Sequence, residues 1–284
     1  MVKNLVLENI SVGFKLPQGV FYAVDDVSLN LPGGNFTAII GESGCGKSVL
    51  GQAILNILPS GVVKKGRVLY NGEQVKKILS AFGIIPQNPS ESLNPVRKIG
   101  KQMQDVLDVH QMADSDNSYK KQCLRLFGLE EAERVLAAYP HELSGGMLQR
   151  VLCAMAVSSK PEWILADEPT KGLDEQVGAV VRKNLLTIKQ DLHLSMLIIT
   201  HDIALAQEVC DDVLVMYAGQ VLEHNMDIWQ KPLHPYTQGF LQALPQNGLQ
   251  VIPGKAPVPG ESFSGCKFAT RCPYCKTRCK EEVP

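Results

Sequence analysis

The sequence predicts an α/β fold with a central parallel sheet, an antiparallel β subdomain and a helical subdomain. Between residues 161 and 225, apolar strand patterns alternate with helical patterns, which is typical of a parallel sheet covered by helices. Residues 1 to about 35 and 61 to 86 show alternating strand patterns separated by turn signals, which favour an antiparallel layer. Residues 95 to 160 have helical periodicity and no strand run, so we expect the helical subdomain there.

A segment rich in proline and turn residues, "QKPLHPYTQGFLQALPQNG", marks a domain boundary. We therefore expect one domain at 1–225, containing the helical subdomain at about 95–160, and a C-terminal extension at 226–284. The net charge of −1 gives no field that would attract nucleic acid or anionic lipid. No apolar run approaches the roughly 18 residues that a membrane span needs. These observations predict a soluble, cytoplasmic protein without a nucleic-acid partner.

The segment "FTAIIGESGCGKSVLGQAILNIL" combines a buried strand at 36–40, a glycine-rich turn and a helix at 48–58. The turn matches G-x-x-x-x-G-K-[ST], in which backbone N–H groups wrap the phosphates of a nucleotide. The lysine of this motif adds a point charge on the β and γ oxygens, and the serine ligates Mg²⁺. We therefore expect nucleotide contacts from Gly41, Glu42, Ser43, Gly44, Cys45, Gly46, Lys47, Ser48 and Val49.

Two further strands end in polar residues that suit phosphate chemistry. In "PEWILADEPTKGLD", a buried strand at 163–166 is followed by Asp167, which we interpret as the Mg²⁺ partner. Glu168 lies one position further, so its side chain points differently and can act on water. In "SMLIITHDIALAQ", a second buried strand ends in His201, which can hold a γ-phosphate and orient both water and base.

The segment "HELSGGMLQR" opens a helix with Ser144, Gly145 and Gly146. The serine is an ordinary N-cap, whereas two glycines behind it are unfavourable because each loses much backbone entropy on ordering. They leave a bare helix N-terminus, where exposed N–H groups and the helix dipole favour an anion.

Taken together, these motifs resemble the ATP-binding subunits of ABC transporters, which are P-loop NTPases with a RecA-like parallel sheet. The matches follow the order of that family along the chain, with a Q-loop at Gln87, a D-loop at residues 172–174, and the signature "LSGGMLQR" shortly before "WILADE". The resemblance implies that two subunits pair head to tail. Each ATP would then contact the partner's signature helix and D-loop, through Ser144, Gly145, Gly146, Gln149 and Asp174.

The resemblance also implies individual roles. Glu168 would be the general base, and His201 would lock base, water and γ-phosphate together. Gln87 would sense Mg²⁺, which is ligated by Ser48, Gln87 and Asp167, and would relay closure to the membrane partner. Phe14 aligns with the aromatic residue that stacks on adenine. Tyr22 is a rival for that role, because "KLPQG" inserts length between the two.

Two segments, "QNPSESLNP" and "HPYTQGFLQALP", resemble the oligopeptide, dipeptide and nickel import subgroup. "NILPSGV" and Leu148 in the signature look more like the nickel-import subunit, since peptide-import subunits more often carry Arg at that position. The resemblance implies ATP-driven import of nickel, a nickel chelate or short peptides. It further implies a second, different ATPase subunit, two permease subunits, an extracytoplasmic binding protein acting indirectly, and a place on the cytoplasmic face of the membrane.

An alternative function is a soluble ABC-type ATPase of iron–sulfur cluster assembly that has no permease. The size of the chain allows this alternative. The C-terminal tail, which resembles that of the import subgroup, argues against it.

The eight cysteines fall into two groups. Four are scattered and are expected to be small buried hydrophobes, namely Cys45, Cys123, Cys153 and Cys210. The other four crowd near the C-terminus, namely Cys266, Cys272, Cys275 and Cys279. In a cytoplasmic protein such density predicts metal binding, with a [4Fe–4S] cluster or Zn²⁺ as the candidates and an unliganded, reduced tail as the alternative.

The resemblance to the import subgroup covers Cys266, Cys272 and Cys279, and some members of that subgroup carry an iron–sulfur cluster there. Cys275 would have to replace the remaining ligand. Nearby cations are expected to offset the charge of the thiolates, namely Lys267, Arg271, Lys276, Arg278 and Lys280.

Overall fold

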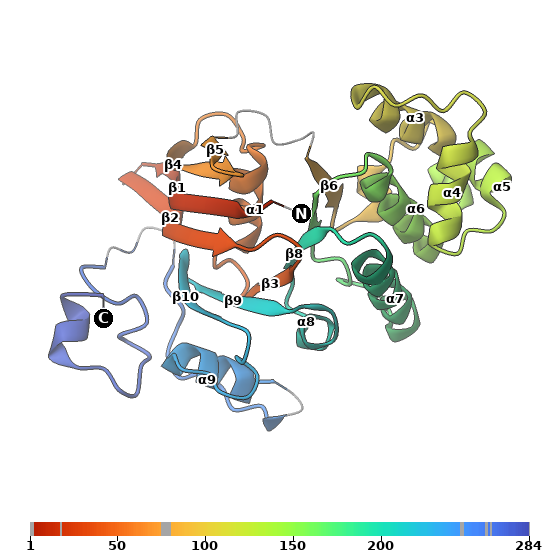
Figure 1. The fold of residues 1–284 in the computed structure, drawn as a ribbon. Helices are drawn as coiled ribbons and strands as arrows, with labels where there is room; N and C mark the ends of the chain where they lie inside the picture. The colour runs from red at the N-terminus through yellow and green to blue at the C-terminus, as the bar shows by residue number, and fades with distance from the viewer. Residues whose placement is uncertain are drawn as a thin grey trace. The chain divides into compact units, whose positions relative to one another are not determined.

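The structure is a computed structural model, and it describes residues 3–17, 19–74, 81–244, 247–258, 261 and 263–283. The chain divides into two compact units (Figure 1). The first unit comprises Met1–Lys3, Pro32–Phe36 and Lys76–Cys210, and the second comprises Asn4–Leu31, Thr37–Val75 and Asp211–Pro284. Residue 226 lies within the second unit, which holds both the C-terminal region and the glycine-rich turn, and the division at 226 stays a prediction.

The second unit contains an antiparallel sheet with the strand order β2-β1-β4-β5. Its strands are β1 (Leu5–Leu16), β2 (Gly19–Leu31), β4 (Val63–Tyr70) and β5 (Glu73–Gln74). Apolar residues of β1 and β2 alternate with polar ones and are fully buried at positions such as Leu5, Leu7 and Leu31. Helix α1 (Lys47–Leu55) packs on β1 and β2. This confirms the predicted antiparallel layer.

The same unit carries the strand that leads into the glycine-rich turn. Strand β3 (Phe36–Gly41) is buried at every position and pairs in parallel with β9 (Asp212–Tyr217), which pairs antiparallel with β10 (Gln220–Asn225). The remainder of the C-terminal region holds α9 (Pro235–Gln242) and the short 3₁₀ helix η4 (Thr277–Lys280).

In the first unit, three parallel strands lie side by side in the order β8-β7-β6. They are β6 (Phe82–Ile85), β7 (Trp163–Asp167) and β8 (Ser195–Ile199). The position of β6 corrects one expectation, because residues up to 86 were expected in the antiparallel layer. The segment "FGII" is an almost continuous apolar run, as parallel strands covered on both faces require.

The helices of the first unit include the predicted helical subdomain. They are α2 (Pro89–Ser92), α3 (Ile99–Val109), α4 (Ser118–Leu126), α5 (Ala132–Ala137), η2 (Pro140–Glu142), α6 (Gly145–Ser158), α7 (Glu175–Asp191) and α8 (Ile203–Val209). Residues 86–162 are all described and contain no strand. Helix α6 packs against α2, α3, α4, α7 and β6, so it occupies the centre of this core.

Three of the four scattered cysteines are buried, as predicted, and Cys210 is half-buried. Cys153 lies in the core of the first unit, where burial raises the pKa of its thiol to about 12. Among the described residues, no helix combines the length and apolar character that crossing a membrane requires.

We expect Gly66→Ala to destabilise the antiparallel sheet more than Gly61→Ala. Both glycines have positive φ, +79° and +89°, so a side chain costs about 1–2 kcal/mol at either position. A Cβ at Gly66 would also lie 2.4 Å from the carbonyl oxygens of Glu8 and Asn9, whereas one at Gly61 would meet open space.

Urea unfolding of the two variants measures the difference, which we expect to be about 1 kcal/mol or more in favour of Gly61→Ala. Equal stabilities would contradict the tight backbone packing seen at Gly66.

Candidate functional site

The glycine-rich turn between β3 and α1 is shaped by close backbone contacts. Gly41 and Gly46 have φ values of +150° and +107°. A Cβ at Gly46 would lie 2.1 Å from the carbonyl oxygen of Ala23, and one at Gly41 would lie 2.2 Å from that of Met216. Only glycine fits at both positions, so the two neighbouring backbones fix the conformation of the loop.

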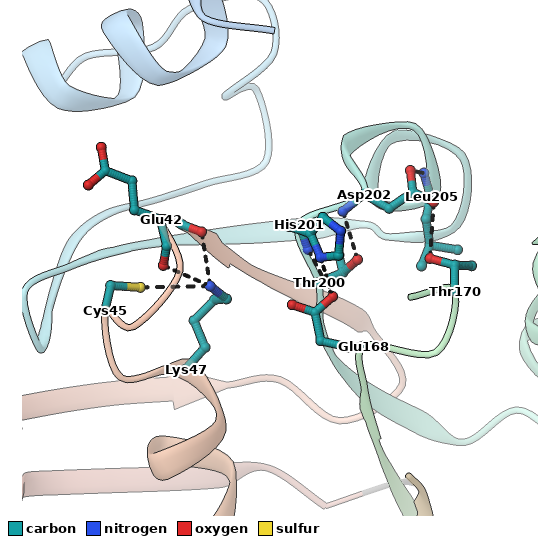
Figure 2. A network of polar contacts seen from close by, with 10 residues as sticks. Glu42, Cys45, Lys47, Glu168, Thr170, Thr200, His201, Asp202 and Leu205 are labelled. Atoms are coloured by element: carbon teal, nitrogen blue, oxygen red, sulfur yellow. Dashed lines mark hydrogen bonds and ion pairs between the residues drawn. The ribbon is translucent and has the colours of Figure 1, made fainter. Parts of the chain in front are cut away.

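Lys47 is the cation of this loop, and its side chain curls back over it (Figure 2). Its Nζ donates to the carbonyl oxygens of Gly41 at 2.9 Å and Glu42 at 3.0 Å, and lies 3.9 Å from Cys45 Sγ. Burial raises the pKa of the Cys45 thiol, which therefore stays neutral beside Lys47. Ser48 lies in the first turn of α1 and is half-buried, where a hydroxyl can serve as a hard-metal ligand.

A cavity of about 520 Å³ lies beside the loop in the same unit. Its walls include Tyr22, Gly44 and Gly219. Phe14 is half-buried opposite Phe21 in the β1–β2 pairing and is not part of this wall. The cavity wall therefore includes Tyr22, together with Phe21 and Phe263, and does not include Phe14, so Tyr22 stays a rival of Phe14 as the residue that would stack on a base.

In the first unit, β7 ends at Asp167, and Glu168 follows with an unusual backbone. Glu168 has φ +49° and is 8% exposed, and its N–H donates to the Ile199 carbonyl oxygen at 2.7 Å. A left-handed conformation is costly for a glutamate, and such strain clusters at functional sites. It turns the carboxylate toward the end of β8.

There the Glu168 carboxylate meets His201, as Figure 2 shows. Oε2 of Glu168 lies 2.5 Å from Nδ1 of His201 and accepts the His201 backbone N–H at 3.3 Å. An ionised carboxylate makes Nδ1 the donor, which fixes the ring orientation and leaves Nε2 directed elsewhere. His201 is 57% exposed at its side chain and Glu168 only 11%, so the imidazole can reach a ligand while it orients the carboxylate.

Polar residues near His201 fix the end of β8 through hydrogen bonds. The sequence patterns described above do not point to these residues. Asp202 caps α8 by accepting the Leu205 N–H at 3.0 Å, and its own N–H donates to Thr200 Oγ1 at 2.9 Å. The Thr170 hydroxyl donates to Asp202 Oδ2 at 3.1 Å. An Asp before an apolar helical run is a known start signal, so Asp202 could have been found from the sequence.

The signature helix α6 begins as predicted. Ser144 is its N-cap and accepts the Met147 N–H at 3.4 Å, and both Ser144 and Gly145 are exposed. Gln149, by contrast, is 1% exposed, and its Nε2 donates to the Pro169 carbonyl oxygen at 3.4 Å. Its contact inside its own chain is therefore established by the structure, and its contact with a partner's nucleotide stays a prediction.

Gln87 and Asp174 are two further residues that the sequence predicts to act at the site, and they lie in different parts of the first unit. Gln87 is exposed two residues after β6. Asp174 caps α7 and accepts the Val177 N–H at 2.9 Å.

The four C-terminal cysteines are all described, and they show no preformed metal site. Among the described residues, no three His, Cys, Asp or Glu side chains are arranged to hold a metal ion. Cys266 and Cys279 are linked through their backbones, by an N–H to carbonyl bond of 2.9 Å, and the Cys275 thiol donates to the Lys276 carbonyl oxygen at 3.6 Å. The binding of a [4Fe–4S] cluster or Zn²⁺ by these four cysteines stays a prediction.

The cations near these cysteines also have other partners than expected. Lys267 Nζ lies 2.7 Å from Asp25 Oδ2, and Arg271 Nη1 lies 3.1 Å from Glu42 Oε1. Both pairs join the C-terminal region to the part of the second unit that holds the glycine-rich turn. These two cations therefore neutralise carboxylates instead of thiolates.

Comparisons with known proteins agree with this arrangement of motifs. The family described as "ABC transporter" matches residues 24–171, and "Oligopeptide/dipeptide transporter, C-terminal region" matches residues 222–279. The oligopeptide transport ATP-binding protein OppD of Haemophilus influenzae is 35% identical, over 97% of this chain and 91% of that protein. The dipeptide transport ATP-binding protein DppD of Escherichia coli is 36% identical, over 99% and 91%.

Solved structures give the same result for the fold. The dimeric, post-hydrolysis ATP-binding cassette MJ0796 bound to ADP and Pi aligns with a TM-score of 0.66 and 26% identity, over 78% of this chain and 97% of that one. CbiO1 from Clostridium perfringens, part of the ABC transporter complex cbiONQ, aligns with a TM-score of 0.64 and 27% identity, over 78% and 88%.

We expect Tyr22→Ala to weaken binding of an adenine nucleotide and Phe14→Ala to leave it unchanged. Stacking of a base on an aromatic ring is worth about 1–3 kcal/mol, which corresponds to a loss of affinity of about fivefold or more. Titration with a fluorescent ATP analogue measures both variants. The two residues are half-buried aromatics of one hairpin, so Phe14→Ala is the matched control. A larger loss in Phe14→Ala would restore the original assignment.

Proposed function

Because this chain belongs to the ABC transporter ATP-binding family, we propose that it is the ATP-hydrolysing subunit of an importer for short peptides. The observation that carries the proposal is the similarity to OppD and DppD along nearly the whole chain, including the transporter C-terminal region at 222–279. These relatives are named for peptide transport, which favours peptides over nickel or a nickel chelate. The same C-terminal region argues against an iron–sulfur assembly ATPase.

In the proposed function, the loop at 41–49 binds the phosphates of ATP. Its backbone N–H groups and Lys47 would supply positive potential, and Ser48, Asp167 and Gln87 are the residues proposed to hold Mg²⁺. Mg²⁺, when bound, neutralises charge that develops on the phosphate oxygens. The half-buried hydroxyl of Ser48 and the strand-end carboxylate of Asp167 are the oxygen ligands that this ion prefers.

Glu168 is proposed as the general base that takes a proton from the attacking water. Its contact with His201 supports this role, because the imidazole fixes the carboxylate and keeps it from turning away. His201 is proposed to hold the γ-phosphate and the water in line with that carboxylate.

The exposed N-terminus of α6 is proposed to complete the site of a second ATPase subunit. Ser144, Gly145 and Gly146 would approach the γ-phosphate bound by the partner, with Gln149 and Asp174 nearby. We further propose two permease subunits, a binding protein that acts indirectly, and a position on the cytoplasmic face of the membrane. The division into an ATP-binding domain at 1–225 and an extension at 226–284 belongs to the same proposal.

The experiment that tests this function is co-purification followed by transport. The tagged chain is isolated with its membrane subunits, reconstituted in vesicles, and supplied with ATP and labelled short peptides or nickel. ATP-dependent uptake of peptides supports the proposal. Uptake of nickel alone, or isolation without any membrane subunit, would overturn it.

We expect Glu168→Gln to retain ATP binding and to slow hydrolysis by about 100-fold or more, because only the base is lost. The variant should accumulate as an ATP-bound dimer, which gel filtration with ATP detects. Glu130→Gln changes an exposed glutamate of the same unit in the same way and should hydrolyse at the wild-type rate. Hydrolysis by Glu168→Gln near the wild-type rate would show that another group is the base.

We expect Gly145→Asp to leave the chain's own ATP binding intact and to suppress hydrolysis in the assembled pair by about 100-fold. A Cβ at Gly145 meets no atom within 4 Å, so the fold tolerates it, whereas its negative charge would oppose the partner's γ-phosphate. Gly145→Ala, without that charge, should lose less activity. Loss of ATP affinity in the isolated Gly145→Asp chain would refute action on the partner's site.

A further inference from the structure

Arg271, in the C-terminal region, is a buried cation with a full set of partners. It is 9% exposed, although arginine is rarely buried unless it is paired. Its Nη1 donates to both carboxylate oxygens of Glu42, at 3.1 and 3.2 Å, and to the Tyr217 hydroxyl at 3.3 Å. Its Nε donates to the Pro253 carbonyl oxygen at 3.1 Å, and Nη2 to that of Ile252 at 3.5 Å. The side chain is therefore held in one position.

Glu42, the partner of Arg271, is the second residue of the phosphate-binding loop and is fixed at its backbone too. Its N–H donates to the Tyr236 hydroxyl at 3.1 Å. Tyr236 is fully buried, with its ring 4.6 Å from that of Tyr217 and 5.5 Å from that of Phe268. Residues from the C-terminal region therefore hold both the main chain and the side chain of Glu42.

A second cation of the same region reinforces this arrangement. Lys267 Nζ donates to Asp25 Oδ2 at 2.7 Å and to the Ala218 carbonyl oxygen at 2.9 Å. The next residue, Gly219, donates its N–H to the Cys45 carbonyl oxygen at 2.9 Å. The carbonyl oxygen of Gly219 accepts the N–H of Asp25, also at 2.9 Å. The segment 266–272, which we call the C-terminal strap, thus contacts the surroundings of the loop at two charged points.

The charge of Glu42 makes the Arg271 contact relevant to phosphate binding. A carboxylate in a loop that receives a triphosphate repels the ligand unless a cation neutralises it, and partial burial weakens the screening by water. Arg271 supplies that cation from a position more than two hundred residues away in sequence. The side chain of Glu42 is 27% exposed and that of Arg271 6%, so the pair is largely shielded from salt.

We propose that Arg271 in the C-terminal strap is a positioning residue for ATP, which neutralises Glu42 and so allows the loop to accept the triphosphate. The inference rests on the proposed ATP binding at residues 41–49 and deepens it. On this inference, the C-terminal region contributes to nucleotide binding. The exposed Arg278, which pairs with Glu282 at 2.7 Å, has no comparable contact with the loop.

The test measures the affinity of the full-length chain for a fluorescent ATP analogue with Mg²⁺. Arg271→Met keeps much of the packing of the side-chain stem and removes the charge, and we expect its Kd to rise about tenfold. The double variant Arg271→Met with Glu42→Gln removes both charges, and we expect it to bind within about threefold of the wild type. Arg278→Met, the matched surface control, should bind like the wild type.

The rescue separates charge neutralisation from a merely structural role, because the double variant still lacks the contacts to Tyr217, Pro253 and Ile252. Equal weakness of the single and double variants, or unchanged affinity of Arg271→Met, would overturn the inference.

If Arg271→Met does not fold, Arg271→Lys takes its place, since it keeps the charge. It should bind within about threefold of the wild type, and a tenfold loss would refute the inference. Failure of the wild type to bind ATP would instead overturn the proposed function, and the inference with it.

Discussion

The phosphate-binding loop passes very close to two neighbouring backbones. The part of the proposed site that would bind the nucleotide depends on this constraint. Gly46 lies against the carbonyl of Ala23 in β2, and Gly41 lies against that of Met216 in β9. No side chain fits at either point, so the sequence must place glycine there and the loop has little freedom left. The backbone of the loop is thereby fixed before a ligand arrives, and a preorganised loop binds an anion with little reorganisation.

Charge balance extends this constraint to the C-terminal region. Lys47 hydrogen-bonds to the carbonyls of the loop itself, and the carboxylate of Glu42 is neutralised by Arg271. In the other unit, the strained backbone of Glu168 and its contact with His201 provide a carboxylate of fixed direction. Each unit therefore fixes these charged groups by contacts among its own residues.

Much of the fold could be predicted because its signals are local. The strand at 163–166 and the N-cap Ser144 depend on neighbouring residues and agree with the structure within one position, whereas the helix expected at 48–58 spans Lys47–Leu55 and ends three residues earlier. Strand pairing is not local, so the sequence does not predict that "FGII" pairs with β7 in a parallel arrangement. The register between β1 and β2 also shifts at Ile10, Val12 and Gly13, which no pattern in the sequence predicts.

The C-terminal region shows the same limit more strongly. Cysteine density and a resemblance suggested a metal site, and the basic residues were interpreted as its counter-charges. The positions of Lys267 and Arg271 could not be foreseen, since their partners Asp25 and Glu42 are separated from them by 242 and 229 residues. Charge alone does not identify a partner. Local sequence patterns do not predict these contacts, because each partner lies far away along the chain.

Calorimetric titration of the chain with ATP and Mg²⁺ shows directly whether residues 41–49 form an ATP site. We expect saturable binding to a single site, which Lys47→Ala abolishes or greatly weakens while thermal unfolding shows that the chain still folds. Equal affinity in Lys47→Ala, or no binding by the wild-type chain, would mean that this loop does not bind ATP.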